Sequence, residues 1–159
     1  MSVLYLKTKF KKGGEKMSDS ENKRAPIIEF FPSSEYYFSL GIAAFQKNDI
    51  LKAKKYLSRA ATLCKTEEEK IFALCQLAIC HQHAGEFNES ITILDTLIEE
   101  SGDIFSEAYY FQANNYAFLE DLEEALELVK MYLKEDPTGD FIEEATELKQ
   151  TLEMELKGY

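Results

Sequence analysis

Residues 40–60 read LGIAAFQKNDILKAKKYLSRA, a stretch with two apolar helical faces separated by a polar break. Asn48 and Asp49 form the break, because both residue types favour turns through hydrogen bonds to their own backbone. On either side, small residues recur at helical spacing and allow two helices to approach closely. This combination predicts a helical hairpin. Its pattern positions are Leu40, Gly41, Ala44, Ala53, Leu57 and Ala60.

The same hairpin pattern occurs twice more along the chain. Gly41, Ala78 and Ala113 occupy its first small position and are 37 and 35 residues apart. The second copy has Leu77, Ala78, His81, Ser90, Leu94 and Leu97, and the third has Gln112, Ala113, Tyr116, Ala125, Val129, Tyr132 and Pro137. One such helix pair cannot bury its apolar face alone, so we expect the three copies to stack on one another.

In spacing and residue pattern, the three copies resemble the tetratricopeptide repeat (TPR) family. The resemblance implies an all-α, TPR-type α-solenoid of three helical hairpins followed by a C-terminal capping helix. The hairpins would cover about residues 34–67, 71–102 and 106–137, and the cap residues 140–157. The alternative is a non-repetitive helical bundle whose small residues share this spacing by coincidence.

Several positions depart from the family pattern. The family often has Trp where this chain has Tyr37, Leu74 and Tyr109, and His81 replaces the usual Tyr. Residues 110–117 are also similar to uncharacterised TPR proteins of low-GC Gram-positive bacteria, some of which continue further. The chain is therefore either a short relative of these proteins or a fragment of a longer one.

Start and stop signals predict where the helices begin and end. Ser33 and Ser34 follow a proline and start the first helix. Thr66 with Glu69 is a capping box for the third helix, and Asp140, with Glu143 three residues on, is expected to cap the seventh. Breaks are expected at Asn48-Asp49, Gly85, Ser101-Gly102-Asp103, Glu120-Asp121 and Pro137-Thr138-Gly139.

The first 33 residues are expected to form a flexible arm outside a TPR domain of residues 34–157. Residues 1–16 are basic and carry no helical stripe, and purine-rich codons for the run just before Met17 can spell a ribosome-binding site. We therefore expect translation to begin at Met17, with a genuine basic arm as the alternative. Ile27–Phe31 is an apolar patch able to tuck against the first repeat.

The net charge of −11 over 159 residues argues against nucleic acid as a partner, since phosphate backbones are bound through clustered Lys and Arg. The charge is uneven, because residues 34–65 hold six Lys or Arg and two acids, whereas residues 99–159 hold four Lys and 17 acids. The acidic half is either a solvated surface or steers a basic partner. No apolar run reaches the ~18 residues of a membrane span. Three cysteines supply no disulfide framework, so we expect a cytoplasmic protein.

The first helix of each hairpin lines the concave groove in TPR proteins, and here its face outside the packing positions is largely apolar. A contiguous exposed apolar surface usually marks a partner site. The expected groove residues are Phe38, Ile42, Phe45, Phe72, Cys75, Ile79, His83, Tyr110, Asn114 and Phe118. The Asn114 amide can both donate to and accept from a peptide backbone. In the alternative, Ile27–Phe31 or the seventh helix covers this face and completes the core.

No catalytic or cofactor motif occurs in the sequence. Cys75, Cys80, His81 and His83 are close together, but on one helix they do not converge as four ligands of a metal ion. The cations that hold carboxylate tails in some TPR grooves have no counterpart either. The matching positions are Phe38, Ile42, Ile79, Glu107 and Phe111.

The sequence therefore predicts a bacterial, non-enzymatic adaptor, without metal or cofactor, that binds an extended or helical segment of a protein or peptide in its groove. One alternative is a secretion-type chaperone for hydrophobic export substrates. Another is a self-assembling structural module, in which the basic first repeat docks on the acidic C-terminal region of another copy as a weak homo-oligomer. The residues alone leave these alternatives open.

Overall fold

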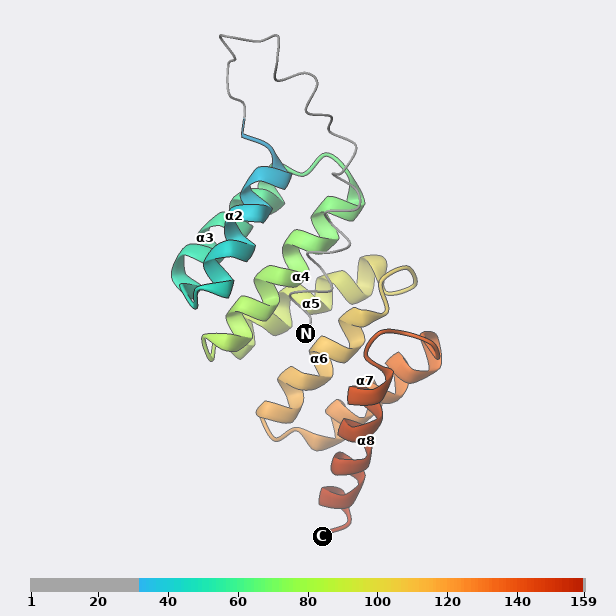
Figure 1. Ribbon diagram of the computed structural model, residues 1–159. Helices are drawn as coiled ribbons and strands as arrows, with labels where there is room; N and C mark the ends of the chain where they lie inside the picture. The colour runs from blue at the N-terminus through green and yellow to red at the C-terminus, as the bar shows by residue number, and fades with distance from the viewer. Residues whose placement is uncertain (1–31, 159) are drawn as a thin grey trace, which may run out of the picture. The chain divides into compact units, whose positions relative to one another are not determined.

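The computed structural model describes residues 32–158, which form seven α-helices and no strand (Figure 1). The predicted all-α, TPR-type fold is confirmed. The helices are α2 (Ser34–Gln46), α3 (Ile50–Thr62), α4 (Glu67–His83), α5 (Phe87–Ser101), α6 (Glu107–Phe118), α7 (Leu122–Glu135) and α8 (Ile142–Leu156). The predictions for residues 1–31, namely the flexible arm, the start at Met17 and the apolar patch Ile27–Phe31, lie outside the described residues.

The described residues belong to two compact units. The first ends at Leu77 and the second begins at Ala78, so the boundary falls inside α4. In the first unit, α2 packs along α3. In the second, α6 packs against both α5 and α7, and α7 also packs against α8.

A close approach of two helices holds the first unit together, as the small residues predict. A Cβ atom added to Gly41 of α2 would lie 2.6 Å from Leu57 Cγ of α3, so only glycine fits there. Ala53, Leu57 and Ala60 have no exposed surface. The Ser34 hydroxyl adds a tie by donating a hydrogen bond of 2.8 Å to the Ala60 carbonyl oxygen.

In the second unit, the repeat-pattern positions are also buried between neighbouring helices. Ala113, Ser90 and Ala125 are fully buried, and so are Leu94 and Val129. Small side chains at these positions let the helices pack closely around a common apolar core, which burial of such side chains stabilises by roughly 25 cal/mol per Å² of apolar surface.

The three hairpin turns repeat one backbone conformation. Asn48, Gly85 and Glu120 are left-handed, with φ of 61°, 75° and 62°, and they are separated by 37 and 35 residues like the small-residue pattern. In each turn the residue after the left-handed one donates a backbone hydrogen bond of 2.8–2.9 Å to a carbonyl oxygen five residues earlier in the chain. The three bonds run from Asp49 to Ala44, from Glu86 to His81 and from Asp121 to Tyr116. Each bond closes the first helix of its hairpin.

The residue after each left-handed position starts the second helix of its hairpin. Asp49 accepts a hydrogen bond from the Lys52 N–H at 3.2 Å, and Asp121 accepts one from the Glu124 N–H at 3.4 Å. The matching Glu86 makes no side-chain cap. Its carboxylate instead lies 2.9 Å from His81 Nδ1.

The two predicted caps at α4 and α8 have different outcomes. At α4 the Thr66 hydroxyl accepts from the Glu69 N–H at 3.1 Å, and the Glu69 carboxylate accepts from the Lys65 N–H at 2.8 Å. At α8 the prediction is wrong, because Phe141 rather than Asp140 is the N-cap and no side chain caps the helix. A buried phenylalanine, held by tertiary contacts, determines where α8 begins.

Candidate functional site

The expected groove residues differ in exposure. Phe38, Ile42, Phe72, Cys75, Ile79 and Tyr110 are buried, Phe45 and Asn114 are partly exposed, and His83 and Phe118 are exposed. The expectation that this face is open to solvent is therefore wrong for six of the ten. Whether these residues bind a partner stays a prediction.

Tyr110 is covered by the start of the last helix. Its ring stacks on the Phe141 ring, with centroids 5.0 Å apart and planes 8° from parallel. Phe111 and Tyr132 complete the aromatic cluster, at 5.6 Å and 5.8 Å from the Tyr110 ring. Burial raises the pKa of the Tyr110 phenol. At this position the start of the last helix covers the face and completes the core. This is one of the two coverings that the sequence left open, the other being Ile27–Phe31.

Asn114 is engaged within its own helix. Its Nδ2 donates to the Tyr110 carbonyl oxygen at 2.9 Å, and its side chain also hydrogen-bonds the Tyr110 phenol, which opposes the rise in that pKa. The Asn114 amide thus supports α6 locally. A ligand backbone would have to displace these bonds to use it.

Gln76 of α4 is the polar group that sequence reasoning missed. It lies four residues after Phe72 and three before Ile79, so the three side chains share one helical face. Gln76 is fully buried, and within residues 32–158 neither its Nε2 nor its Oε1 has a hydrogen-bond partner. A buried amide without partners costs about 1–3 kcal/mol for each unsatisfied group. The sequence alone carries no signal for it, because glutamine is ordinary on a helix face and its burial is visible only in the structure.

A second buried polar group has a structural role. Gln112 Nε2 of α6 donates to the Ile91 carbonyl oxygen at 3.0 Å and to Asp95 Oδ1 at 2.7 Å, both on α5. Asn115 Nδ2 donates to Ser90 Oγ and to Gln112 Oε1, each at 2.9 Å. These bonds fix the register of α5 against α6, so this network belongs to the core.

One apolar group lies at the surface of the second unit. Phe118 is 68% exposed and stacks on Phe87, with ring centroids 5.3 Å apart. Leu119 beside it is 46% exposed. The three side chains form a small apolar patch where α6 ends and α5 begins.

Residues 32–158 contain neither a cluster of metal-ligating side chains nor a helix that could span a membrane. No group of three His, Cys, Asp or Glu side chains in this range is placed to hold a metal ion, and Cys75 and Cys80 are fully buried. No helix in this range is long and apolar enough to cross a membrane.

Known proteins resemble this chain in sequence and in fold. Residues 34–67 match the family model of the tetratricopeptide repeat. Over 141 residues, or 89% of the chain, the sequence is 31% identical to the TPR repeat-containing protein YvcD of Bacillus subtilis strain 168, and it spans 28% of that protein. The fold is similar to that in the crystal structure of the apo form of RapI, with a TM-score of 0.74. The match covers the whole of this chain and 65% of RapI, and the sequence identity is 11%.

Proposed function

Because the chain contains a tetratricopeptide repeat and has the all-α, TPR-type fold, we propose that it is a protein-interaction module that binds an extended or helical polypeptide segment. The binding surface in this proposal is the apolar face of the first helix of each hairpin. On α4 the proposed contact residues are Phe72 and Ile79, with Gln76 between them in the helix. The module binds its partner and does not act on it chemically.

The unpartnered Gln76 amide carries this proposal. A core selected for stability alone favours an apolar side chain at a fully buried position, because both amide atoms lose their hydrogen bonds to water there. A polypeptide backbone supplies one N–H donor and one C=O acceptor at each residue. A bound segment would therefore satisfy both Gln76 atoms, while Phe72 and Ile79 would bury apolar side chains of the partner.

Burial of this face in the free protein sets a condition on binding. The partner must take the place of the side chains that cover Gln76, so part of its binding energy is spent on opening the face. We expect an extended segment, or the terminal turn of a helical one, because only there are backbone N–H and C=O groups without partners inside the segment. Apolar residues on either side of these groups would contact Phe72 and Ile79.

Site-specific photo-crosslinking in cells tests the proposal. A photo-reactive phenylalanine analogue at position 76 should join the chain to a defined polypeptide. The same analogue at position 94, in the core of α5, is the matched control and should give no such product. Equal products from both positions, or none from position 76, would refute binding at this face.

A further inference from the structure

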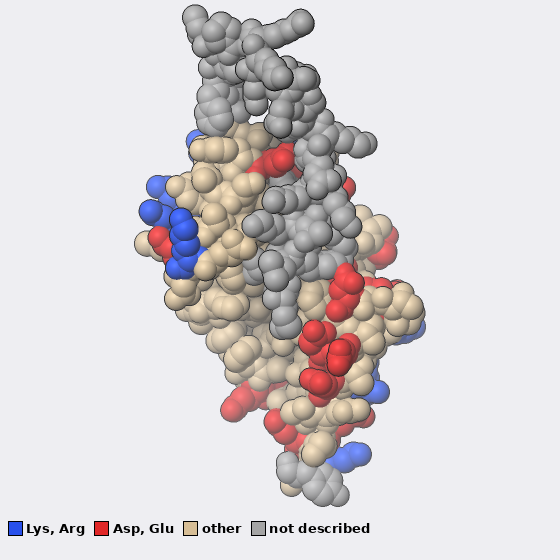
Figure 2. All heavy atoms as spheres, viewed as in Figure 1, with Lys and Arg blue, Asp and Glu red and all other residues tan. Residues whose placement is uncertain are grey.

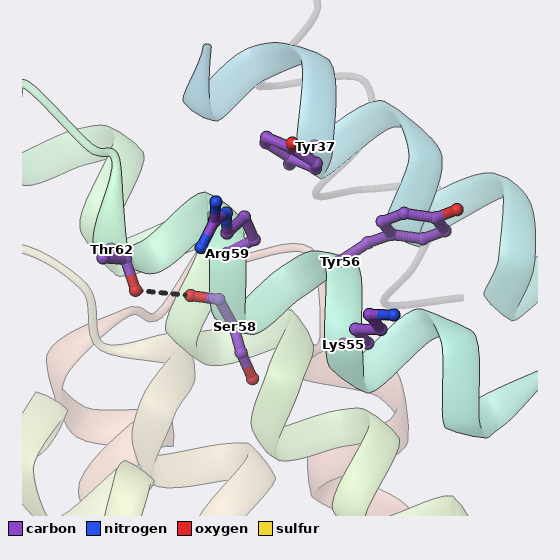
Figure 3. Close-up of a pocket in the computed structure, with 6 residues that line it drawn as sticks. All are labelled: Tyr37, Lys55, Tyr56, Ser58, Arg59 and Thr62. Carbon is purple, nitrogen blue, oxygen red and sulfur yellow. Dashed lines mark hydrogen bonds between the residues drawn. The ribbon is translucent and has the colours of Figure 1, made fainter. Parts of the chain in front are cut away.

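A separate pocket lies in the first unit and is lined by residues of α2 and α3. It has a volume of about 620 Å³ and is open to solvent. Tyr37 of α2 contributes one wall, and Figure 3 shows that the other labelled side chains come from α3. They are Lys55, Tyr56, Ser58, Arg59 and Thr62.

Two tyrosine rings and a guanidinium group give this pocket its form. Tyr37 and Tyr56 stack with centroids 6.3 Å apart and planes 28° from parallel. Arg59 Cζ lies 5.9 Å from the centroid of the Tyr37 ring, within cation–π distance. A guanidinium held against a ring loses part of its conformational freedom before binding, and it keeps its N–H donors in the plane of the group.

The positive charge in the pocket is uncompensated. No acidic residue lines it, and within residues 32–158 neither Lys55 nor Arg59 forms an ion pair. Residues 34–65 carry six Lys or Arg and two acids, and Figure 2 shows Lys and Arg side chains gathered over this hairpin. The field at the pocket therefore attracts an anion.

We propose that this pocket binds an acidic peptide segment. A glutamate or aspartate carboxylate of the peptide is held by Arg59 and Lys55, and a neighbouring apolar or aromatic side chain lies against Tyr37 and Tyr56. Arginine holds a carboxylate with two parallel N–H bonds, which suits the exposed edge of a stacked guanidinium. A cavity of this volume is large enough for more than one side chain.

A carboxylate fits this position better than a phosphate. Ser58, Arg59 and Thr62 lie in the last turns of α3, which ends at Thr62. The carbonyl groups there carry a partial negative charge of roughly half a unit. This charge repels a phosphate, with nearly two negative charges, more strongly than a carboxylate with one. The net charge of −11 further disfavours a nucleic acid.

Peptide titration tests this assignment. The probe is a fluorescein-labelled Glu-Glu-Phe-Glu-Glu peptide, with Gln-Gln-Phe-Gln-Gln as the uncharged control, followed by fluorescence anisotropy at about 50 mM salt, where screening is modest. The acidic peptide should bind and the control should not. The double variant Lys55→Gln/Arg59→Gln should weaken binding about tenfold or more, as expected for loss of a charged hydrogen-bonded pair.

The matched control removes the same charge elsewhere in the hairpin. Lys47→Gln/Lys65→Gln should leave the affinity nearly unchanged, and Gln76→Leu should do so as well, because the pocket does not depend on the α4 face. Equal losses in both double variants, or no binding of the acidic peptide to the wild-type chain, would overturn the proposal. So would displacement of the peptide by inorganic phosphate at lower concentration than by glutarate. Sedimentation without peptide could also show a dimer that the Lys55→Gln/Arg59→Gln variant does not form. That result would overturn the proposal too, because the pocket would then be occupied by a second copy of the chain.

Discussion

The backbone N–H of Phe141 donates a hydrogen bond of 3.1 Å to the phenol oxygen of Tyr132. This bond joins α7 to the N-cap residue of α8, and the Phe141 ring stacks on Tyr110 of α6. Tyr132 is fully buried. A position of the repeat pattern and a residue outside the repeats thus share one contact, which makes the cap part of the second unit's core.

The first prediction concerns the pH dependence of stability. Burial raises the pKa of Tyr132 to about 12, although the bond from the Phe141 N–H opposes the rise. The unfolded chain releases this proton near pH 10 and the folded chain near pH 12, so the contribution to stability is complete below pH 10 and is lost as the pH rises to 12. Urea unfolding should show that Tyr132→Phe is about 1–2 kcal/mol less stable at pH 7 and loses less stability between pH 10 and 12. Parallel pH profiles would contradict this.

The second prediction concerns the contact between α2 and α3. Gly41→Ala would place a methyl group 2.6 Å from Leu57 Cγ. The two helices must then separate or Leu57 must change rotamer, at a cost of about 1–3 kcal/mol. Urea unfolding should show that the double variant Gly41→Ala/Leu57→Ala loses less free energy of unfolding than the two single variants lose in total. The reason is that the shorter side chain at position 57 removes the clash. Additive losses would show that the two residues do not compete for space.

The third prediction concerns the left-handed turns. Glu120 has φ of 62° and Gly85 has φ of 75°. Glu120→Gly should raise stability by about 0.5–1 kcal/mol by relieving the steric cost of this conformation. Gly85→Ala should lower it by a similar amount through backbone strain alone, since no atom lies within 4 Å of the added Cβ. Thermal unfolding of both variants should therefore give melting temperatures on opposite sides of the wild type, and shifts of the same sign would refute the argument.

The fourth prediction separates buried from exposed aromatic residues on α6. Tyr110→Ala removes a ring that contacts Phe111, Tyr132 and Phe141, and should cost about 3 kcal/mol or more. Phe118→Ala removes a ring that is 68% exposed and should change stability by about 0.5 kcal/mol or less. Urea denaturation measures both. Similar losses for the two variants would mean that the α8 region does not cover Tyr110.

Local signals were sufficient to predict the helices and most of their ends. The Asn48-Asp49 and Glu120-Asp121 breaks, Gly85 and the Thr66 capping box act through the nearest few residues, and the structure has all of them. The start of α8 could not be read in this way, because Phe141 is placed by contacts with Tyr110 and Tyr132 on other helices.

Exposure of the groove face was also beyond local reasoning. A repeat pattern identifies which residues pack within a hairpin, but the coverage of Tyr110 depends on a segment more than 30 residues later in the chain. For a related reason, the sequence did not identify Gln76 as a residue of interest. Glutamine is ordinary on a solvated helix face, and only full burial without partners makes it informative.

Urea unfolding of Gln76→Leu, with and without the polypeptide that crosslinks at position 76, tests the proposed function most directly. Alone, the variant should be more stable than the wild type by about 2 kcal/mol or more, because leucine removes two buried polar atoms, each of which costs about 1–3 kcal/mol when unsatisfied. The polypeptide should stabilise the wild type clearly more than the variant, since only the wild type offers the amide to its backbone. A variant that is less stable alone, and that gains as much from the polypeptide as the wild type does, would show that Gln76 is a core residue without a role in binding.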